Sequence, residues 1–255
     1  MIRLAKEEKA RRILERQQVE PKLKVLWPDR YLSDTPETFF KFATECCWTF
    51  DEETSQVALI PQAEHVEFYC HLWWNSRHTG KALVTEKSRR QLISWVDRAC
   101  MLCAMGQRAE VRVIAGLTLP KAADHTWRMA WLYREARTRL WRNLPDCRTR
   151  ATQDGGYEEH KSSSVTLPNG SLVTALNQES DTYQGSGYAG VVLEEFSLFK
   201  RCARMWGQSH AVTKGRADVI GGHVVAIVNA DPSAEYKEIK KLKKVLANYD
   251  PTWRP

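Results

Sequence analysis

The sequence lacks the features of a membrane or secreted protein. No apolar run approaches the ~20 residues that a helix needs to span a bilayer, so we expect no membrane segment. The first twenty residues, MIRLAKEEKARRILERQQVE, are charged throughout and hold no apolar core, which does not fit a signal peptide. Internal repeats and low-complexity tracts are also missing. With 43% hydrophobic residues, the chain is expected to fold rather than remain disordered.

A second pair of metal-ligating cysteines is missing as well. The seven cysteines are odd in number and scattered, which favours reduced thiols in a cytoplasmic setting. Cys100 and Cys103 form a C-x-x-C in an apolar, helix-like stretch, but no other pair has the spacing of a zinc site. We therefore interpret both as buried structural thiols rather than metal or redox groups.

Charge and tryptophan content are the notable surpluses. The formal net charge is +7 with a pI near 9.0, which is compatible with a polyanionic partner. The 10 tryptophans are candidates for core and interface positions, since indole offers a large, rigid contact area. A charge surplus of this size suggests a class of partner but does not identify one.

Apolar runs alternate with amphipathic segments along the chain. Helices are predicted at 1–20, 37–47, 61–77, 90–105, 121–141, 197–210 and 232–246. Strands are predicted at 56–60, 82–85, 111–116, 189–193 and 223–228, and Asn169-Gly170 predicts a hairpin between 165–167 and 172–176. The alternation predicts an α/β fold with a mostly parallel sheet sandwiched by helices. Ligands bind such sheets beyond the carboxyl ends of the strands, here after Thr85, Leu193 and Val228.

Phosphate binding is predicted after the second of these strands. Gly80-Lys81 precedes the strand and lacks the rest of a G-x-x-x-x-G-K-[ST] loop, so we interpret it as a turn. Residues 86–92 follow the strand, and a helix begins near Ile93, whose N-terminus would favour an anion. Lys87 could reach phosphates there, and Ser94 could offer its hydroxyl to Mg²⁺. The loop contains no glycine, and an ordinary basic helix start is the alternative.

Two carboxylates follow the apolar strand at 189–193. Glu194 and Glu195 match a Walker B arrangement, in which the first carboxylate joins the Mg²⁺ shell and the second polarises the attacking water. A strand that runs into a solvated acidic turn is the alternative. A further strand and a long helix lie between Lys87 and Glu194, as expected for a P-loop core.

The order of these segments resembles the ATPase domain of the large terminases, the motor subunits that package DNA in tailed bacteriophages. The resemblance covers roughly residues 37–235. The segments that carry it are KSRRQLISW (87–95), VRVIAGLTLPKAADHTW (111–127), LPNGSLVTAL (167–176), SDTYQGSGYAGVVLEEFSLF (180–199) and VVAIVNADP (224–232). The resemblance implies a P-loop NTPase-type fold over 37–246, preceded by a charged helix and linker at 1–36 and followed by a tail at 247–255.

The resemblance also implies roles for single residues. Lys87 is similar to the shifted lysine of a deviant Walker A loop, and Ser94 to its magnesium-coordinating hydroxyl. The implied ATP-binding residues are Lys87, Ser88, Arg89, Arg90, Gln91, Ser94 and, as an adenine contact, Gln62. Glu194 would stand in the metal-binding place, Glu195 would be the catalytic base, and Asn229 would sense the γ-phosphate. A helix-start Gln62 and a strand-capping Asn229 are the alternatives.

Two positions depart from the family pattern. Leu92 stands where the loop glycine is usual, and a left-handed backbone there would be strained. Gln184-Gly185 stands where the family often has Arg-Gly, so an arginine finger must come from elsewhere, with Arg201 and Arg204 as candidates.

The resemblance implies an ATP- and Mg²⁺-dependent motor that moves double-stranded DNA in the host cytoplasm. Its implied partners are a portal protein, a small terminase subunit and copies of itself in a ring. Too little sequence follows Asn229 for the family's nuclease, so no DNA cleavage is expected. The alternatives are a helicase-like ATPase and a degenerate P-loop module that binds DNA without turnover.

Contacts to DNA phosphates need only clustered cations. The candidates are the Lys237–Lys244 cluster and Arg134, Arg137, Arg139 and Arg142 on the long helix, with a solvated face as the alternative. Trp127, Trp131 and Trp141 on the same helix are interpreted as packing or subunit contacts.

Overall fold

The computed structural model describes residues 24–51, 54–87, 92–150, 163–178, 187–200, 202–214 and 222–229. Its helices are η1 (Asp29–Tyr31), α2 (Pro36–Cys46), α3 (Glu64–Thr79), α4 (Ile93–Gln107), α5 (Leu119–Leu140), η3 (Phe196–Leu198) and α6 (Cys202–Lys214). Its strands are β1 (Trp48–Phe50), β2 (Val57–Leu59), β3 (Leu83–Lys87), β4 (Val111–Gly116), β5 (Arg148–Arg150), β6 (Ser164–Thr166), β7 (Leu172–Asn177), β8 (Gly190–Leu193) and β9 (His223–Asn229). The helices predicted at 1–20 and 232–246 and the tail at 247–255 lie outside the described residues.

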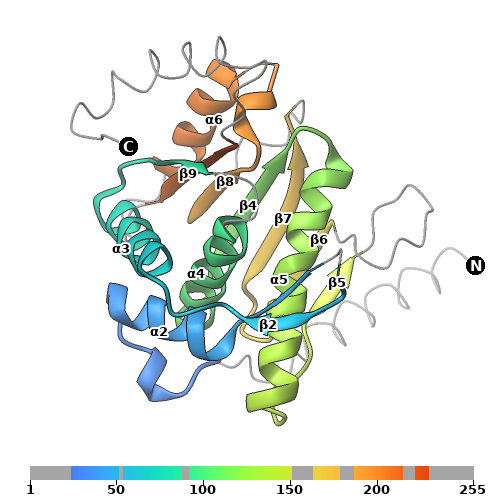
Figure 1. The fold of residues 1–255 in the computed structure, drawn as a ribbon. Coiled ribbons are helices and arrows are strands. Elements are labelled where there is room, and N and C mark those ends of the chain that lie inside the picture. The colour runs from blue at the N-terminus through green and yellow to red at the C-terminus, as the bar shows by residue number, and fades with distance from the viewer. Residues whose placement is uncertain are drawn as a thin grey trace, which may run out of the picture.

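Within the described residues, seven strands form one sheet in the order β3-β9-β8-β4-β7-β6-β5 (Figure 1). The pairs from β3 to β7 are parallel, while β7 with β6 and β6 with β5 are antiparallel. The predicted hairpin is the β6–β7 pair, and Gly170 in its turn has φ +87°, a value that suits glycine. The α/β class with a mostly parallel sheet is therefore confirmed.

Side chains of the central strands alternate between two apolar layers. Ile114, Val192 and Val225 face one core, which also holds the buried faces of α2, α3, α4 and part of α5. Their chain neighbours Val113 and Val191 face a second core together with aromatic residues of η3 and α6. Helices thus cover both faces of the sheet, and the short apolar runs in the sequence are strands buried on both sides.

The tryptophans of α5 are packing residues. Trp127 and Trp131 lie 5.5 Å apart between ring centroids, and the Trp131 indole donates to the Trp48 carbonyl at 2.9 Å. Trp141 packs on Trp27 at 5.1 Å, and Trp27 in turn lies against Gly106 of α4, where any added Cβ would overlap its ring. These contacts hold the segment before α2 against α4 and α5.

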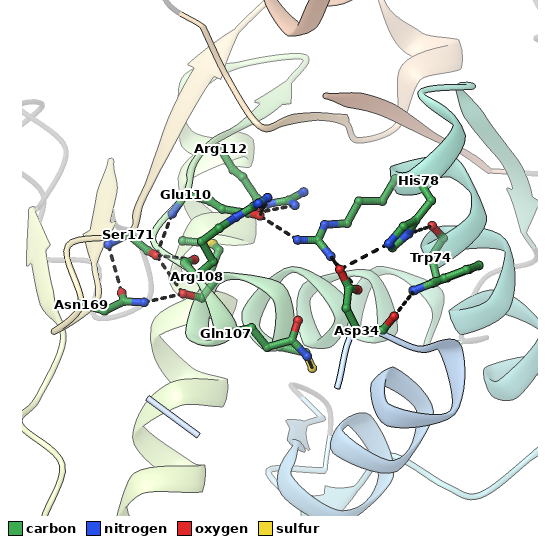
Figure 2. A network of polar contacts seen from close by, with 12 residues as sticks. Asp34, Trp74, His78, Gln107, Arg108, Glu110, Arg112, Asn169 and Ser171 are labelled. Carbon is green, nitrogen blue, oxygen red and sulfur yellow. Dashed lines mark hydrogen bonds and ion pairs between the residues drawn. The ribbon is translucent and has the colours of Figure 1, made fainter. Parts of the chain in front are cut away.

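A buried ionic network fixes the amino-terminal edge of the sheet (Figure 2). Glu110, just before β4, accepts from Arg112 at 2.6 Å and from Arg77 of α3 at 2.9 Å, and Arg77 also donates to Asp34 at 2.8 Å. The Ser171 hydroxyl, in the β6–β7 turn, donates to the Met105 carbonyl at 2.9 Å. The network holds the end of α4 at the amino-terminal edge of the sheet. The start of α4 therefore lies at the opposite, carboxyl-terminal edge.

The observed bounds of several helices and strands differ from the predicted ones. β3 runs on to Lys87, because parallel pairing with β9 continues to that residue, so Lys87 belongs to a strand rather than to the loop. The helix predicted at 197–210 is split into η3 and α6, separated by the extended Phe199. Strands β1 and β5 were not predicted, since each has three residues and follows a helix or loop without an apolar alternation. No described helix is long and apolar enough to cross a membrane.

Candidate nucleotide site

The sequence-predicted residues at the ends of β3, β9 and β8 lie at one edge of the sheet. Lys87 ends β3, and its Cα pairs in register with that of Asn229, which ends β9. β9 lies between β3 and β8, and Glu194 directly follows β8. Because these strands are parallel, their carboxyl ends share an edge, which is where α/β folds bind ligands.

Ser94 and Glu194 meet at this edge. Ser94 is the second residue of α4, and its buried hydroxyl lies 3.4 Å from Glu194 Oε2. The other carboxylate oxygen, Oε1, accepts from the Arg98 guanidinium at 2.5 Å. Arg98 lies one turn after Ser94, so a single face of α4 supplies both contacts.

Two residues of this cluster, Asp97 and Arg98, were not foreseen in the sequence. Asp97 is fully buried and bonds to Arg98, and it also accepts from the Tyr69 hydroxyl at 2.9 Å and the Trp73 indole at 3.1 Å. Both aromatic donors come from α3. A signal was present, because Asp97-Arg98 interrupts an otherwise apolar helix, but the sequence does not say which groups they would meet.

Electrostatics favour an ionised Glu194. Burial alone would raise its pKa, but the positive charges of Arg98, Lys87 and Arg128 act against burial, and the pKa lies below its ordinary value. Burial in turn lowers the pKa of His125 to about 3, so this imidazole is neutral at pH 7, at 3.6 Å from Glu194 Oε1. Lys87 influences the pKa of both groups, so its charge lies within electrostatic range of the carboxylate.

Glu195 faces a different group and holds an unusual backbone. Its φ of 51° and ψ of 40° lie in the left-handed region, which costs energy for any residue other than glycine. Its carboxylate accepts from Lys121, in the first turn of α5, at 2.9 Å, and about a third of the Glu195 side chain is exposed. The two adjacent glutamates therefore differ in environment, one buried among cations and one open to solvent.

The start of α4 shares this backbone feature. Leu92, at its N-cap, has φ 59° and ψ 1°, and its side chain makes no capping hydrogen bond. The left-handed conformation expected for a loop glycine is thus present at Leu92 despite its side chain. Strained positions of this kind gather at functional sites, where the surrounding structure holds them.

Most of the other predicted residues lie outside the part of the chain that the structure describes. Ser88, Arg89, Arg90 and Gln91 lie outside the described residues, as do Gln184, Gly185, Arg201 and the Lys237–Lys244 cluster. Gln62 is exposed in the loop before α3, and no contact among the described residues links it to Lys87 or Ser94. Arg204 lies exposed on α6.

The candidate DNA-contacting arginines of α5 make local contacts. Arg139 pairs with Glu135 at 2.8 Å, and Arg134 pairs with Asp146 at 3.3 Å. The Arg137 and Arg142 guanidinium groups donate to the carbonyls of Leu144 and Thr138. Arg134, Arg137 and Arg139 occupy the carboxyl-terminal half of α5, whereas Arg142 follows the end of the helix at Leu140 and not, as predicted, within it. Lys121, at the beginning of α5, contacts the site. Their role in binding DNA stays a prediction.

Comparison with solved structures places the fold. The chain superposes on the HK97 bacteriophage large terminase with a TM-score of 0.55 and 13% identity, covering 84% of this chain and 42% of that one. The large terminase of a thermophilic bacteriophage gives a TM-score of 0.50 and 14% identity, over 74% of this chain and 44% of that one. This is the fold of the bacteriophage large terminases.

At such identity the likeness concerns the large terminase fold alone. No family model matches the sequence, and no curated protein matches it significantly. The chain spans less than half the length of both large terminases. The resemblance derived from the motifs and the observed topology thus lead to the same fold by separate routes.

Proposed function

We propose that this chain is the ATP-hydrolysing motor domain of a viral DNA-packaging large terminase. The observation that carries the proposal is the meeting of the Ser94 hydroxyl and the Glu194 carboxylate, 3.4 Å apart, at the sheet edge where β3 ends in Lys87. The sequence separates these groups widely, and a shared ligand site explains why a lysine, a hydroxyl and a carboxylate converge at the carboxyl edge of a parallel sheet.

The residues present fit a magnesium–nucleotide complex. Mg²⁺ prefers oxygen ligands and is usually held by one or two protein groups together with substrate phosphates. The Ser94 hydroxyl and Glu194 Oε2 supply such oxygens and would hold the ion. When bound, Mg²⁺ neutralises phosphate charge and orients the phosphates for transfer.

The remaining site residues bind the nucleotide or activate the attacking water. Lys87 and the N-terminus of α4 bind the phosphates, since a helix N-terminus and a cation both favour an anion. The exposed carboxylate of Glu195, held by Lys121, accepts the proton of the attacking water. Ser88, Arg89, Arg90 and Gln91 complete the phosphate loop, Gln62 contacts adenine, and Asn229 senses the γ-phosphate.

The motor function extends to partners. As a large terminase domain, the chain acts in the host cytoplasm on double-stranded DNA, with a portal protein, a small terminase subunit and further copies in a ring. The DNA contact is to the phosphate backbone, because packaging must tolerate any sequence. This chain hydrolyses ATP and does not cleave DNA.

Nucleotide-dependent thermal unfolding together with phosphate release tests the proposal. MgATP should raise the unfolding temperature, because a ligand that binds only the folded state stabilises it. Lys87→Ala should remove the shift, and Glu195→Gln should keep the shift but stop phosphate release. Lys41→Ala, at an exposed position of α2 outside the site, is the matched control and should change neither.

The possible outcomes separate the functions. Binding without phosphate release, with and without duplex DNA, would favour a degenerate module. An unchanged shift in Lys87→Ala would refute the assignment of the site. Unwinding of a short duplex would favour a helicase-like enzyme.

A further inference from the structure

The start of α4 carries a second polar pair that the proposed hydrolysis does not use. Asp97 and Arg98 are both fully buried, and each contacts the other. We propose that Arg98, held by Asp97, is a positioning residue that fixes the rotation of the Glu194 carboxylate and leaves one of its oxygens beside Ser94. The inference rests on the proposed function and deepens it.

The two oxygens of Glu194 have different neighbours. Oε1 accepts from Arg98 Nη2 at 2.5 Å, and Oε2 lies 3.4 Å from the Ser94 hydroxyl. Ser94 and Arg98 are four residues apart on α4, so the helix presents both groups to one carboxylate. Rotation of the carboxylate would break the short contact to Arg98. The contact between Arg98 and Oε1 therefore leaves Oε2 as the carboxylate oxygen that lies beside the Ser94 hydroxyl.

Asp97 fixes the guanidinium that does the positioning. It bonds to Arg98 through Oδ2, while Oδ1 accepts from Tyr69 at 2.9 Å and from Trp73 at 3.1 Å. The carboxylate of Asp97 is thus held by donors from α3. The negative charge of Asp97 also offsets part of the positive charge of Arg98. Without Asp97, that positive charge would act on Glu194 alone and would repel a cation bound at Glu194.

Stability alone does not account for the cluster. Three buried charges cost desolvation energy, and well-packed apolar residues in place of such a cluster are often equally stable or more so. Arg98 Nε has no hydrogen-bond partner among the described residues, so even the guanidinium is incompletely satisfied. A cluster that is costly to bury and adjoins the site is best explained by its action on Glu194.

Titration of a fluorescent ADP analogue, with saturating Mg²⁺ and separately with EDTA, tests the proposal. The readout is the ratio of the two dissociation constants, which measures how strongly Mg²⁺ improves binding. In Arg98→Met this ratio should fall about 10-fold or more, as for outer-shell groups of metal sites, while binding in EDTA stays within about 3-fold. Arg98→Lys keeps a cation and should recover part of the ratio.

A double variant guards against a loss of folding. Asp97→Asn with Arg98→Met removes both charges together, so its thermal unfolding should return toward wild type while the Mg²⁺ effect stays lost. A wild-type ratio in the double variant, or an equal loss of binding with and without Mg²⁺, would reduce the pair to a structural role. Wild-type protein that binds no nucleotide would instead overturn the proposed function itself, and this inference with it.

Discussion

Glu195 offers a test that separates catalysis from stability. Its left-handed backbone, at φ 51°, costs a residue with a side chain about 1–2 kcal/mol, and Glu195→Gly removes that cost. Against this stand about 0.5–1 kcal/mol for the greater freedom of glycine in the unfolded chain. The lost ion pair with the half-exposed Lys121 adds at most about 1 kcal/mol. The free energy of unfolding should therefore stay within about 1 kcal/mol of wild type.

Turnover should respond quite differently to the same substitution. Loss of a general base lowers the rate about 10²–10⁴-fold, so phosphate release should nearly stop while the nucleotide-dependent thermal shift persists. Ser55→Gly is the matched control, because Ser55 has a similar φ of 55° and lies between β1 and β2, away from the site. It should keep both stability and turnover. Urea denaturation and phosphate release measure the two quantities. A Glu195→Gly protein that hydrolyses ATP normally would refute the role of this carboxylate, and one destabilised by more than about 2 kcal/mol would refute the strain reasoning.

Three further predictions concern the amino-terminal edge of the sheet, opposite the candidate site, and the end of α4. Glu110→Gln should lower the free energy of unfolding by about 3–5 kcal/mol at pH 7, because it leaves the fully buried Arg112 without its anion; urea denaturation measures this. The Arg112 and Arg77 charges hold the pKa of Glu110 well below its ordinary value. The ionised Glu110 therefore stabilises the fold fully at a pH above its ordinary pKa, and this stabilisation is lost as the pH falls from there toward the lowered pKa. Burial lowers the pKa of His223 well below its ordinary value of 6.5. As the pH falls below 6.5, the unfolded chain binds a proton at this imidazole and the folded chain does not, which destabilises the fold. His223→Leu should therefore lose less stability between pH 7 and pH 5 than wild type. Gly106→Ala should destabilise by about 1–3 kcal/mol, because the new Cβ would overlap the Trp27 ring.

Gly207→Ala adds the same methyl to an open position on α6 and should be neutral or stabilising, so equal losses in Gly106→Ala and Gly207→Ala would contradict the packing argument. A loss below about 1 kcal/mol in Glu110→Gln would mean that Arg112 finds another anion. An unchanged pH dependence in His223→Leu would show that this imidazole does not resist protonation.

Local sequence signals predicted the α/β class and the sheet edge that carries the candidate site. Apolar runs of four to seven residues, separated by amphipathic segments, are typical of strands buried on both faces, and their carboxyl ends carry Lys87, Glu194 and Asn229. These signals are local: strand length, periodicity and the residue that follows each strand. They could not place β1 or β5, which have three residues each and show no apolar alternation.

How these residues meet depends on strand order and on the packing of helices. Strand order placed β9 between β3 and β8, and the packing of α3 against α4 brought Tyr69 and Trp73 to Asp97, which bonds to the guanidinium that holds Glu194. Nor did the letter Leu at position 92 reveal a left-handed residue, since the surrounding fold imposes that conformation against local preference. Contacts across some hundred residues depend on packing between elements, and no periodicity within an element encodes them.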